Sequence, residues 1–530
     1  MSALRARTVL GFPGAPRTHP GNLADSQRNG KGFIRGYSLM FSNALIYWFR
    51  NDLRLCDNAS LLLACASAES RRLLPVYCHD PAEDAATRWG FVRRGPHRRA
   101  FLAAALADLD AQVRARGSRL LQLRGAPAEV LPALARAIGA DTVVCEEIAA
   151  PEEQDAVAAL RAAGLTVRTV WQSALLDPAA LPFAVERLPK VFTDFRRAVE
   201  AAGQQPPAPL AAPAVLPPLP DAIFLPPHSG LEPAHIAPCR SGASRDPAAQ
   251  TSSACGLPAA DDRGLRHSYR APGAPEPLPI GDRAHAHAHA HASFPWWQPE
   301  FAGGERAALA HLARYFAGDA AQRYKTTRNG LAGIDFSSKF SPWLAQGALS
   351  ARVAVAALRR HEAERGANES TYWLWFELLW RDYFRFLHLQ HGRRLYRARG
   401  LDERASPPAH DPEAFARWCA GHTGHAFIDA GMRELAATGW LSNRMRQVVA
   451  SYLIHDLGCD WRAGAAWFEA QLVDYDVYSN QGNWLYIAGR GTDPRGGRRF
   501  DPDRQAAMYD PDGAYRARWC SVGRCVGVSG

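Results

Sequence analysis

The sequence lacks the patterns that define several common classes of protein. No apolar run approaches the roughly 20 residues of a membrane span, so we expect no membrane partner. The ten cysteines include no CxxC pair, which argues against a zinc site or a disulfide framework. We therefore predict no metal site and a reducing compartment, the cytoplasm. No GxGxxG or Walker loop opens a predicted helix, so the common dinucleotide-binding fingerprints are absent.

The composition is that of a large, basic globular chain. With 530 residues, 47% of them hydrophobic and 22% charged, it has room for two or more domains. The formal net charge is +10, from 62 lysines and arginines against 52 acids. Excess basic charge favours polyanions such as nucleic acid, although many basic proteins bind none.

Strand and helix patterns alternate in the N-terminal third. Short apolar runs at residues 44–49, 73–78, 120–123 and 142–146 are typical of buried strands, and Ala/Leu-rich segments between them are typical of helices. This alternation predicts an α/β domain with a Rossmann-like, doubly wound parallel sheet over residues 44–175.

The segments on either side of this domain carry few structural signals. Residues 1–43 are basic and rich in glycine and proline. A transit peptide fits that composition, but we favour a disordered or mis-assigned leader because Met40 directly precedes the first strand. Residues 176–300 read as a proline-rich linker. Within it, residues 225–294 contain an alternating Ala-His run, which we interpret as a disordered low-complexity insert rather than a metal-binding strand.

Beyond residue 301 the apolar pattern becomes helical. Trp373, Trp380 and Phe384 recur at helical spacing, and residues 301–510 are predicted to form an all-helical domain. Residues 511–530 are predicted to be a frayed tail.

Three spans of the helical domain mix polar and aromatic residues too densely for an ordinary core. They are residues 373–384 (WLWFELLWRDYF), 440–447 (WLSNRMRQ) and 475–495 (YDVYSNQGNWLYIAGRGTDPR). Amides and carboxylates buried without partners are costly. Such density therefore indicates the wall of a ligand pocket, with planar rings for a planar ligand.

A further candidate segment is a helix start. Ser337, Ser338, Lys339 and Ser341 come directly before Pro342, and serine at the N-cap with proline at the first helical position is a strong start signal. The free N–H groups, the hydroxyls and the cation of such a segment suit a pyrophosphate.

Together these segments, with residues 48–61 (WFRNDLRLCDNASL) and 324–330 (YKTTRNG), resemble the photolyase/cryptochrome family, most closely its DASH branch. The motifs occur in family order over about residues 44–175 and 300–520. The resemblance implies an antenna domain joined to an FAD-binding helical domain, and DNA containing pyrimidine dimers as the partner. We expect a monomer.

The resemblance assigns the cofactor contacts residue by residue. Phosphate and ribose contacts fall on Tyr324, Ser337, Ser338, Lys339, Phe340 and Ser341, and the remaining FAD contacts on Glu377, Arg381, Asn443, Arg446, Asp474, Asp476 and Asn480. Arg446 is the expected ion-pair partner of Asp474. Asn480 falls where the family places the amide that faces flavin N5 and tunes the cofactor.

Glu377, Trp380 and Arg381 share one helical face, which by itself fits an amphipathic helix with an intrahelical Glu–Arg pair. By resemblance, Glu377 instead bonds the damaged base and Trp380 stacks on it. Burial beside a flavin would raise the pKa of Glu377 and let it donate a proton or hydrogen bond.

The resemblance also implies the DNA contacts. Arg444 points to the DNA backbone, and Asn443 belongs to the catalytic set. Tyr486 replaces a second stacking tryptophan of standard bacterial photolyases, and its smaller ring fits a preference for single-stranded DNA, in which the dimer is already unpaired.

Two other functions are implied at separate positions. Trp484 and Trp461 match the first two members of an electron-transfer chain, but the outer member falls on Pro408, which has no π-system. Either the chain ends at Trp461, or another aromatic such as Tyr396 or Trp440 completes it. Glu152 or Glu153 is implied to hold an antenna, 5,10-methenyltetrahydrofolate, although a solvated acidic turn fits the sequence equally well.

The sequence thus predicts a light-dependent lyase that splits pyrimidine dimers with an electron from reduced FAD. Two alternatives stay open. One is a light sensor without repair activity, and the other is a light-independent nucleic-acid-binding protein.

Overall fold

The computed structural model describes residues 44–68, 72–220, 232–233 and 282–520. The predicted leader at residues 1–43, most of the predicted insert and residues 521–530 lie outside these described residues.

The N-terminal part is built on one sheet with the strand order β5-β4-β1-β2-β3-β6. The strands are β1 (Ala44–Phe49), β2 (Arg72–His79), β3 (Leu121–Arg124), β4 (Ala140–Glu146), β5 (Thr166–Val170) and β6 (Glu232–Pro233). The first five pair in parallel, whereas β6 pairs antiparallel with β3. The predicted α/β fold class is confirmed. The short strand β5 was not predicted.

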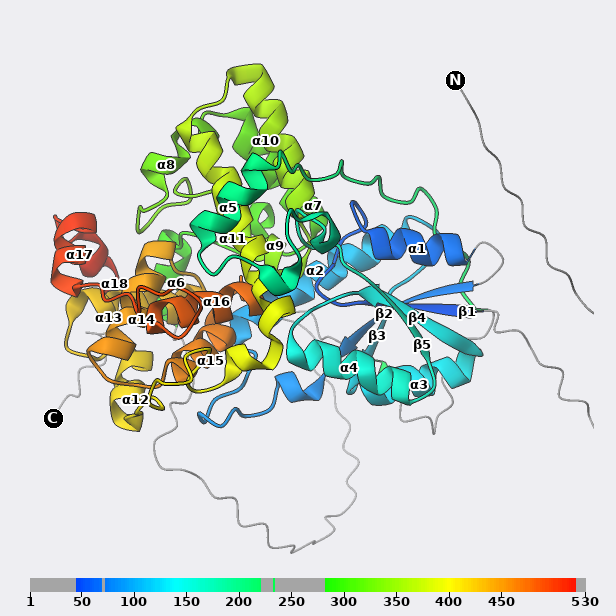
Figure 1. The fold of residues 1–530 in the computed structure, drawn as a ribbon, viewed down its shortest axis with the longest axis horizontal. Helices are drawn as coiled ribbons and strands as arrows, with labels where there is room; N and C mark the ends of the chain where they lie inside the picture. The colour runs from blue at the N-terminus through cyan, green and yellow to red at the C-terminus, as the bar shows by residue number, and fades with distance from the viewer. Residues whose placement is uncertain (1–43, 69–71, 221–231, 234–281, 521–530) are drawn as a thin grey trace, which may run out of the picture. The chain divides into compact units, whose positions relative to one another are not determined.

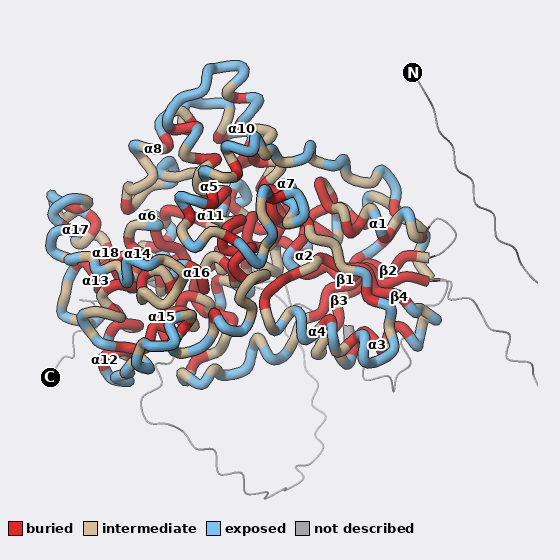
Figure 2. Tube along the Cα trace, viewed as in Figure 1, coloured by how far each residue is buried: buried red, intermediate tan, exposed pale blue. Residues whose placement is uncertain are grey.

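Helices cover both faces of this sheet (Figure 1). On one face, Leu45 of β1 packs with helices α1 (Ala59–Ser67) and α2 (Pro96–Arg114). On the other, Ile46 of β1 packs with α3 (Pro127–Ile138) and α4 (Pro151–Ala162). Every residue of β1 is buried, as parallel strands between two helical layers require, and the strands lie in the buried interior in Figure 2.

The rest of the described chain is helical. The helices are α5 (Phe192–Ala201), α6 (Asp282–His291), α7 (Glu305–Ala317), α8 (Tyr324–Thr327), α9 (Ser341–Gln346), α10 (Ala351–Arg365), α11 (Glu369–His391), α12 (Pro412–Ala420), α13 (Ala426–Thr438), α14 (Asn443–His455), α15 (Trp461–Gln471), α16 (Val477–Ala488), α17 (Pro502–Tyr509) and α18 (Ala514–Cys520). None of the described helices has the length and apolar content of a membrane span.

Helix α11 joins the helical part to the sheet. Its Asp382 is fully buried and accepts hydrogen bonds from the backbone N–H groups of Leu175 and Leu176, at 2.9–3.0 Å. Its N-terminus is closed by a capping box between Asn368 and Thr371. The Asp382 bonds and the capping box therefore fix the position of α11.

The Ala-His run is not a disordered insert where it is described, because it forms helix α6. Ala288 is buried, the ring of His287 lies edge-on to Trp519 at 5.3 Å, and His289 stacks on Trp297 at 4.6 Å. Alanine is the best helix former, and that propensity outweighs the strand-like alternation. No group of three or more metal-ligating side chains occurs among the described residues.

The frayed tail predicted for residues 511–530 is wrong for residues 514–520. Helix α18 packs on α13 and buries Tyr515 and Trp519. The buried carboxylate of Asp510 accepts from the backbone N–H of Tyr515 at 2.8 Å and from Arg516 Nε at 2.8 Å. A local cap and two buried rings thus fix this helix.

Candidate functional site

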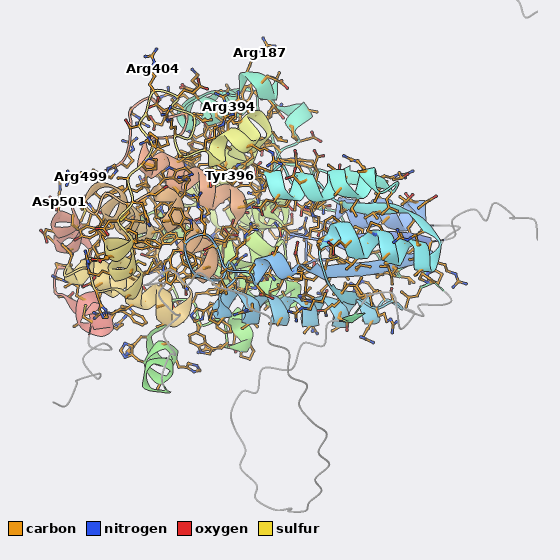
Figure 3. The ribbon with its side chains drawn as sticks, turned by 90° about the horizontal axis from the view of Figure 1, so that it is seen from below. Arg187, Arg394, Tyr396, Arg404, Arg499 and Asp501 are labelled. Atoms are coloured by element: carbon orange, nitrogen blue, oxygen red, sulfur yellow. The ribbon has the colours of Figure 1, made fainter. Side chains whose placement is uncertain are left out.

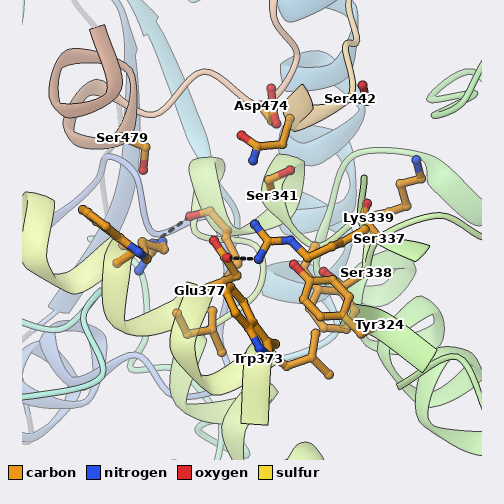
Figure 4. A pocket seen from close by; sticks show the side chains of 18 of the residues that line it. Tyr324, Ser337, Ser338, Lys339, Ser341, Trp373, Glu377, Ser442, Asp474 and Ser479 are labelled. Atoms are coloured by element: carbon orange, nitrogen blue, oxygen red, sulfur yellow. Dashed lines mark hydrogen bonds and ion pairs between the residues drawn. The ribbon is translucent and has the colours of Figure 1, made fainter. Parts of the chain in front are cut away.

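A large cavity of about 570 Å³, called the main cavity below, lies between the loop before α9 and helices α11, α14 and α16 (Figure 4). It brings together most of the predicted site residues. These are Tyr324, Ser337, Ser338, Lys339, Phe340, Ser341, Glu377, Trp380, Arg381, Asn443, Arg446, Asp474 and Tyr486. A smaller cavity of about 90 Å³ shares Asn443, Arg446 and Asp474 with it and is also lined by Asp476, Asn480 and Trp484.

The loop before α9 supplies a buried cation to this cavity. Ser337 and Lys339 have left-handed backbones, with φ of 63° and 57°. Lys339 is only 4% exposed, and its ammonium lies 5.1 Å from the ring centroid of Trp440. Burial lowers the pKa of Lys339 to about 7. A bound anion would offset the free-energy cost of burying the Lys339 ammonium.

The helix start at this loop was predicted correctly, but its cap was not. Ser341 is the first residue of α9, and the cap position is Phe340, which makes no side-chain cap bond. The nearby serine hydroxyls therefore line the cavity and do not cap the helix.

Glu377 is bound by an arginine that the sequence did not single out. Arg328 Nη1 lies 2.6 Å from Glu377 Oε1, and its guanidinium lies over the rings of Trp373 and Tyr324 at 4.8 and 5.9 Å. Burial raises the pKa of Glu377, while Arg328 opposes that shift. Only the YKTTRNG motif pointed to this residue.

The intrahelical Glu377–Arg381 pair, left open by the sequence, does not form. Arg381 donates instead to the backbone carbonyls of Ser173 and Leu344. Its burial lowers the pKa of Arg381 to about 10. The arginine thus ties α11 to the chain that follows β5, while it still lines the cavity.

The predicted pair of Arg446 and Asp474 is confirmed, with Nη2 and Oδ2 2.9 Å apart. Asp474 Oδ1 is buried and has no hydrogen-bond partner among the described residues, and the same holds for Trp440 Nε1. Both residues line the main cavity. Because orphaned buried polar atoms are costly, these atoms indicate a polar ligand. An acceptor, a donor and the Lys339 cation around a cavity of this size fit FAD.

Both carboxylate oxygens of Asp476 bind other parts of the protein. It caps α16 by accepting from the backbone N–H of Ser479 at 2.8 Å, and its other oxygen pairs with Arg385 at 2.8 Å. Burial alone would raise the pKa of Asp476, but Arg385, Arg381 and the hydrogen bonds from Ser479 together lower it to about 2. Asn480 donates to the carbonyl of Ala465 at 3.0 Å, which fixes its amide beside Trp484 in the smaller cavity.

Trp380 and Tyr486 line the same wall of the main cavity, with ring centroids 6.2 Å apart. One face of Trp380 is covered by Phe192 of α5, stacked at 3.8 Å. Tyr486 accepts a hydrogen bond from Arg498 Nε at 2.8 Å. Phe192 was not identified from the sequence, because it lies in the segment interpreted as linker.

Arg444 lies outside these cavities. Its guanidinium is 4.9 Å from the ring centroid of Tyr509 and 5.7 Å from that of Phe500, and it bonds Asn329 Oδ1 at 3.3 Å. Its assignment as a contact to the DNA backbone stays a prediction.

A separate cavity of about 560 Å³, called the second cavity below, is lined by Trp461, Glu152, Glu153 and Asn480. Glu152 pairs with Arg93 at 2.6 Å, and the backbone carbonyl of Glu153 accepts from Arg50 at 3.0 Å.

The two predicted electron-transfer residues, Trp484 and Trp461, are both buried but have different neighbours. Trp484 is buried against Gly464, where a Cβ would lie 2.2 Å from the indole. Trp461 is also buried and donates to the carbonyl of Ala398 at 3.1 Å. Next to Pro408, His410 packs on the ring of Trp89 at 4.8 Å, and Trp89 lines the same cavity as Trp461.

Comparison with known proteins agrees with this geometry. The family model for the FAD binding domain of DNA photolyase matches residues 373–526, and that for DNA photolyase matches residues 45–214. The chain is 42% identical to Cryptochrome DASH of Gloeobacter violaceus, over 91% of this chain and 86% of that protein. It is 41% identical to Cryptochrome DASH of Xenopus laevis, over 90% and 82%.

Among solved structures, a cryptochrome from Synechocystis sp. superposes with a TM-score of 0.73 at 37% identity, covering 90% of this chain and 88% of that chain. A class III photolyase from Agrobacterium tumefaciens does so with a TM-score of 0.67 at 27% identity, covering 92% and 88%. The fold and the cavity are thus those of a photolyase-like, FAD-binding protein. The chain belongs to the photolyase/cryptochrome family, in its cryptochrome DASH branch.

Proposed function

We propose that the protein is a light-dependent lyase that splits cyclobutane pyrimidine dimers, with a preference for single-stranded DNA. The observation that carries this proposal is the placement of Glu377, Trp380 and Tyr486 in one cavity with the Asp474–Arg446 pair and Lys339. The first three suit the two linked bases of a pyrimidine dimer, and the others suit FAD.

Bound FAD in its reduced, light-excited form would supply the electron for dimer splitting. The protein's own residues hold the reactants. Trp380 has one face packed on Phe192, so its other face and its edge can meet a flipped base. Burial raises the pKa of Glu377 against the opposing charge of Arg328, and a protonated Glu377 would be able to donate to a base carbonyl.

The surface supports a polyanionic partner. The net charge is +10, and Figure 3 shows Arg187 and Arg404 extending beyond the ribbon into solvent. Such charge attracts a phosphate backbone without reading its sequence. The proposed preference for single strands rests on Tyr486, whose ring stacks less area than an indole.

We further propose that Glu152 or Glu153 holds a folate antenna in the second cavity. That cavity also contains Asn480, which lines the smaller cavity beside the proposed flavin site, so the two chromophores would be neighbours. An absorption band of the purified protein in the near-UV, beyond that of flavin and reduced by Glu152→Gln or Glu153→Gln, is the expected result.

The deciding experiment uses protein with chemically reduced FAD, illuminated with a single-stranded oligonucleotide that carries one dimer. We expect loss of the dimer in light but not in darkness. Glu377→Gln should lower the yield of repair more than the affinity, whereas Glu364→Gln, at an exposed position on α10, serves as a matched control.

The same experiment separates the alternatives. A yellow protein that repairs neither single-stranded nor looped substrate would contradict the lyase and favour a light sensor. A well-folded protein that binds DNA but takes up no flavin would favour a light-independent nucleic-acid-binding protein.

A further inference from the structure

The loop before α9 has an unfavourable backbone where it lines the main cavity. Ser337 and Lys339 both have left-handed φ values, 63° and 57°, and they flank Ser338. Residues with a Cβ seldom adopt this conformation, and they keep it only when their surroundings impose it. The loop therefore needs a restraint from outside its own sequence.

His311 of α7 supplies that restraint. Its Nε2 lies 2.9 Å from the backbone carbonyl oxygen of Ser338, and Nη2 of Arg314 lies 2.8 Å from its Nδ1. A guanidinium can only donate, so Nδ1 must accept. Nε2 therefore carries the proton and donates to Ser338, which places a directional bond at the residue between the two left-handed ones.

The imidazole is enclosed by aromatic rings. Trp343, Phe301 and Phe340 lie at centroid distances of 5.0, 5.5 and 5.9 Å, and His311 is 5% exposed. Burial lowers the pKa of His311 to about 4, so the ring stays neutral near pH 7. Water has little access to replace the bond to Ser338.

The helix that carries His311 is anchored at its other end. Glu305, the first residue of α7, is buried and accepts from the backbone N–H groups of Leu55 and Cys56 at 2.9 and 2.8 Å. This bond pair ties α7 to the loop that follows β1. His311 thus restrains the cavity loop from a helix whose own position is fixed.

We infer that His311 is a positioning residue, which holds residues 337–341 in the conformation that binds the phosphates of the flavin cofactor. The inference rests on the proposed function only for the identity of this ligand. Preorganising the loop before binding removes an ordering cost that the ligand would otherwise bear.

The test compares His311→Phe, which keeps a ring within the aromatic cage, with His311→Gln, which keeps a donor. Hydrogen exchange of a peptide spanning residues 335–343 is measured in flavin-free protein, and FAD affinity by fluorescence titration. We expect faster exchange in the Phe variant and a dissociation constant raised about tenfold, the effect of losing one hydrogen bond. The Gln variant should recover most of the protection from exchange and most of the FAD affinity. Unchanged exchange and affinity in the Phe variant would overturn the inference.

A second variant covers the case in which His311→Phe destabilises the whole protein. Arg314→Leu leaves the ring in place and removes the donor that fixes its tautomer. It should speed exchange in residues 335–343 and leave the rest of the protein unchanged, and no change there would overturn the inference. Wild-type protein that binds FAD but repairs no dimer would refute the lyase and leave this result standing.

Discussion

Asp474→Asn is the most informative single substitution at the cavity. It conserves shape but leaves Arg446 without its anion. Removing one partner of a buried ion pair costs about 3–5 kcal/mol. The carboxylate side chain is 2% exposed and the arginine side chain 22%, and Arg446 keeps a bond to the carbonyl of Leu441 at 3.0 Å, so the low end applies. We expect a loss of about 3 kcal/mol in the unfolding free energy of flavin-free protein.

The ring of Trp440 makes this cost larger for the free protein than for the complex. Arg446 and Lys339 lie 5.0 and 5.1 Å from its centroid, so two cations share one aromatic ring and lose one nearby carboxylate when Asp474 is replaced. A bound diphosphate would supply negative charge again. Flavin should therefore restore part of the lost stability, although the variant should bind it more weakly.

Urea unfolding at pH 7 measures the effect, and a double-mutant cycle with Arg446→Gln tests its origin. Arg446→Gln alone leaves the buried carboxylate of Asp474 unpaired and should cost a similar amount. The double variant removes both charges, so its loss should be smaller than the sum of the single losses by about 2 kcal/mol. Additive losses would refute the argument, since they would mean that the two charges do not stabilise one another.

Three further outcomes are expected. Trp380→Ala should weaken binding of dimer-containing single strands by about 1–3 kcal/mol with little change in flavin content, and equal binding by both proteins would remove Trp380 from the lesion pocket. Glu434 of α13 is fully buried and accepts from the Tyr515 hydroxyl at 2.5 Å, and burial raises its pKa from 4.5 to about 7. The unfolding free energy should therefore fall as the pH rises through that window, and Glu434→Gln should flatten the fall. Because Pro408 cannot carry a radical, photoreduction of oxidised flavin by an external donor should be slow in absorbance measurements. Rapid reduction that is abolished by both Trp484→Phe and Trp461→Phe, and by substituting a third aromatic, would contradict this.

The sheet was predictable because its central strands are continuous apolar runs, whereas strand β5 was not. β5 reads TVRTV and carries exposed residues at Thr166 and Arg168, as an edge strand does, so its pattern is weak. The same limit explains helix α6. In the Ala-His run, alternation by two suggests a strand, whereas the segment forms a helix that packs against distant rings such as Trp519.

Residues of the site were predictable where the chemistry is local to one motif, and less so where it depends on a partner far along the chain. Arg446 and Asp474 were paired correctly, although Arg446 lies on α14 and Asp474 in the turn before α16, because the family pattern carries both. Arg328 and Phe192 were not predicted because their roles arise from contacts with α11 that no spacing rule encodes. Arg328 makes its contact from the residue after α8, and Phe192 from the start of α5.

The polar density of residues 475–495 marks the site for a reason different from the one the sequence suggested. Much of it serves structure: Tyr478 accepts from the backbone N–H of Ala149 at 2.7 Å, Gln481 donates to the carbonyl of Leu395 at 2.7 Å, and Asp476 caps α16. These bonds fix α16 against the α/β part and against the chain after α11. At the cavity wall beside this helix, the buried acceptor Asp474 Oδ1 has no partner among the described residues. A binding site is thus recognised less by how many polar groups a segment holds than by which of them the fold leaves without a partner.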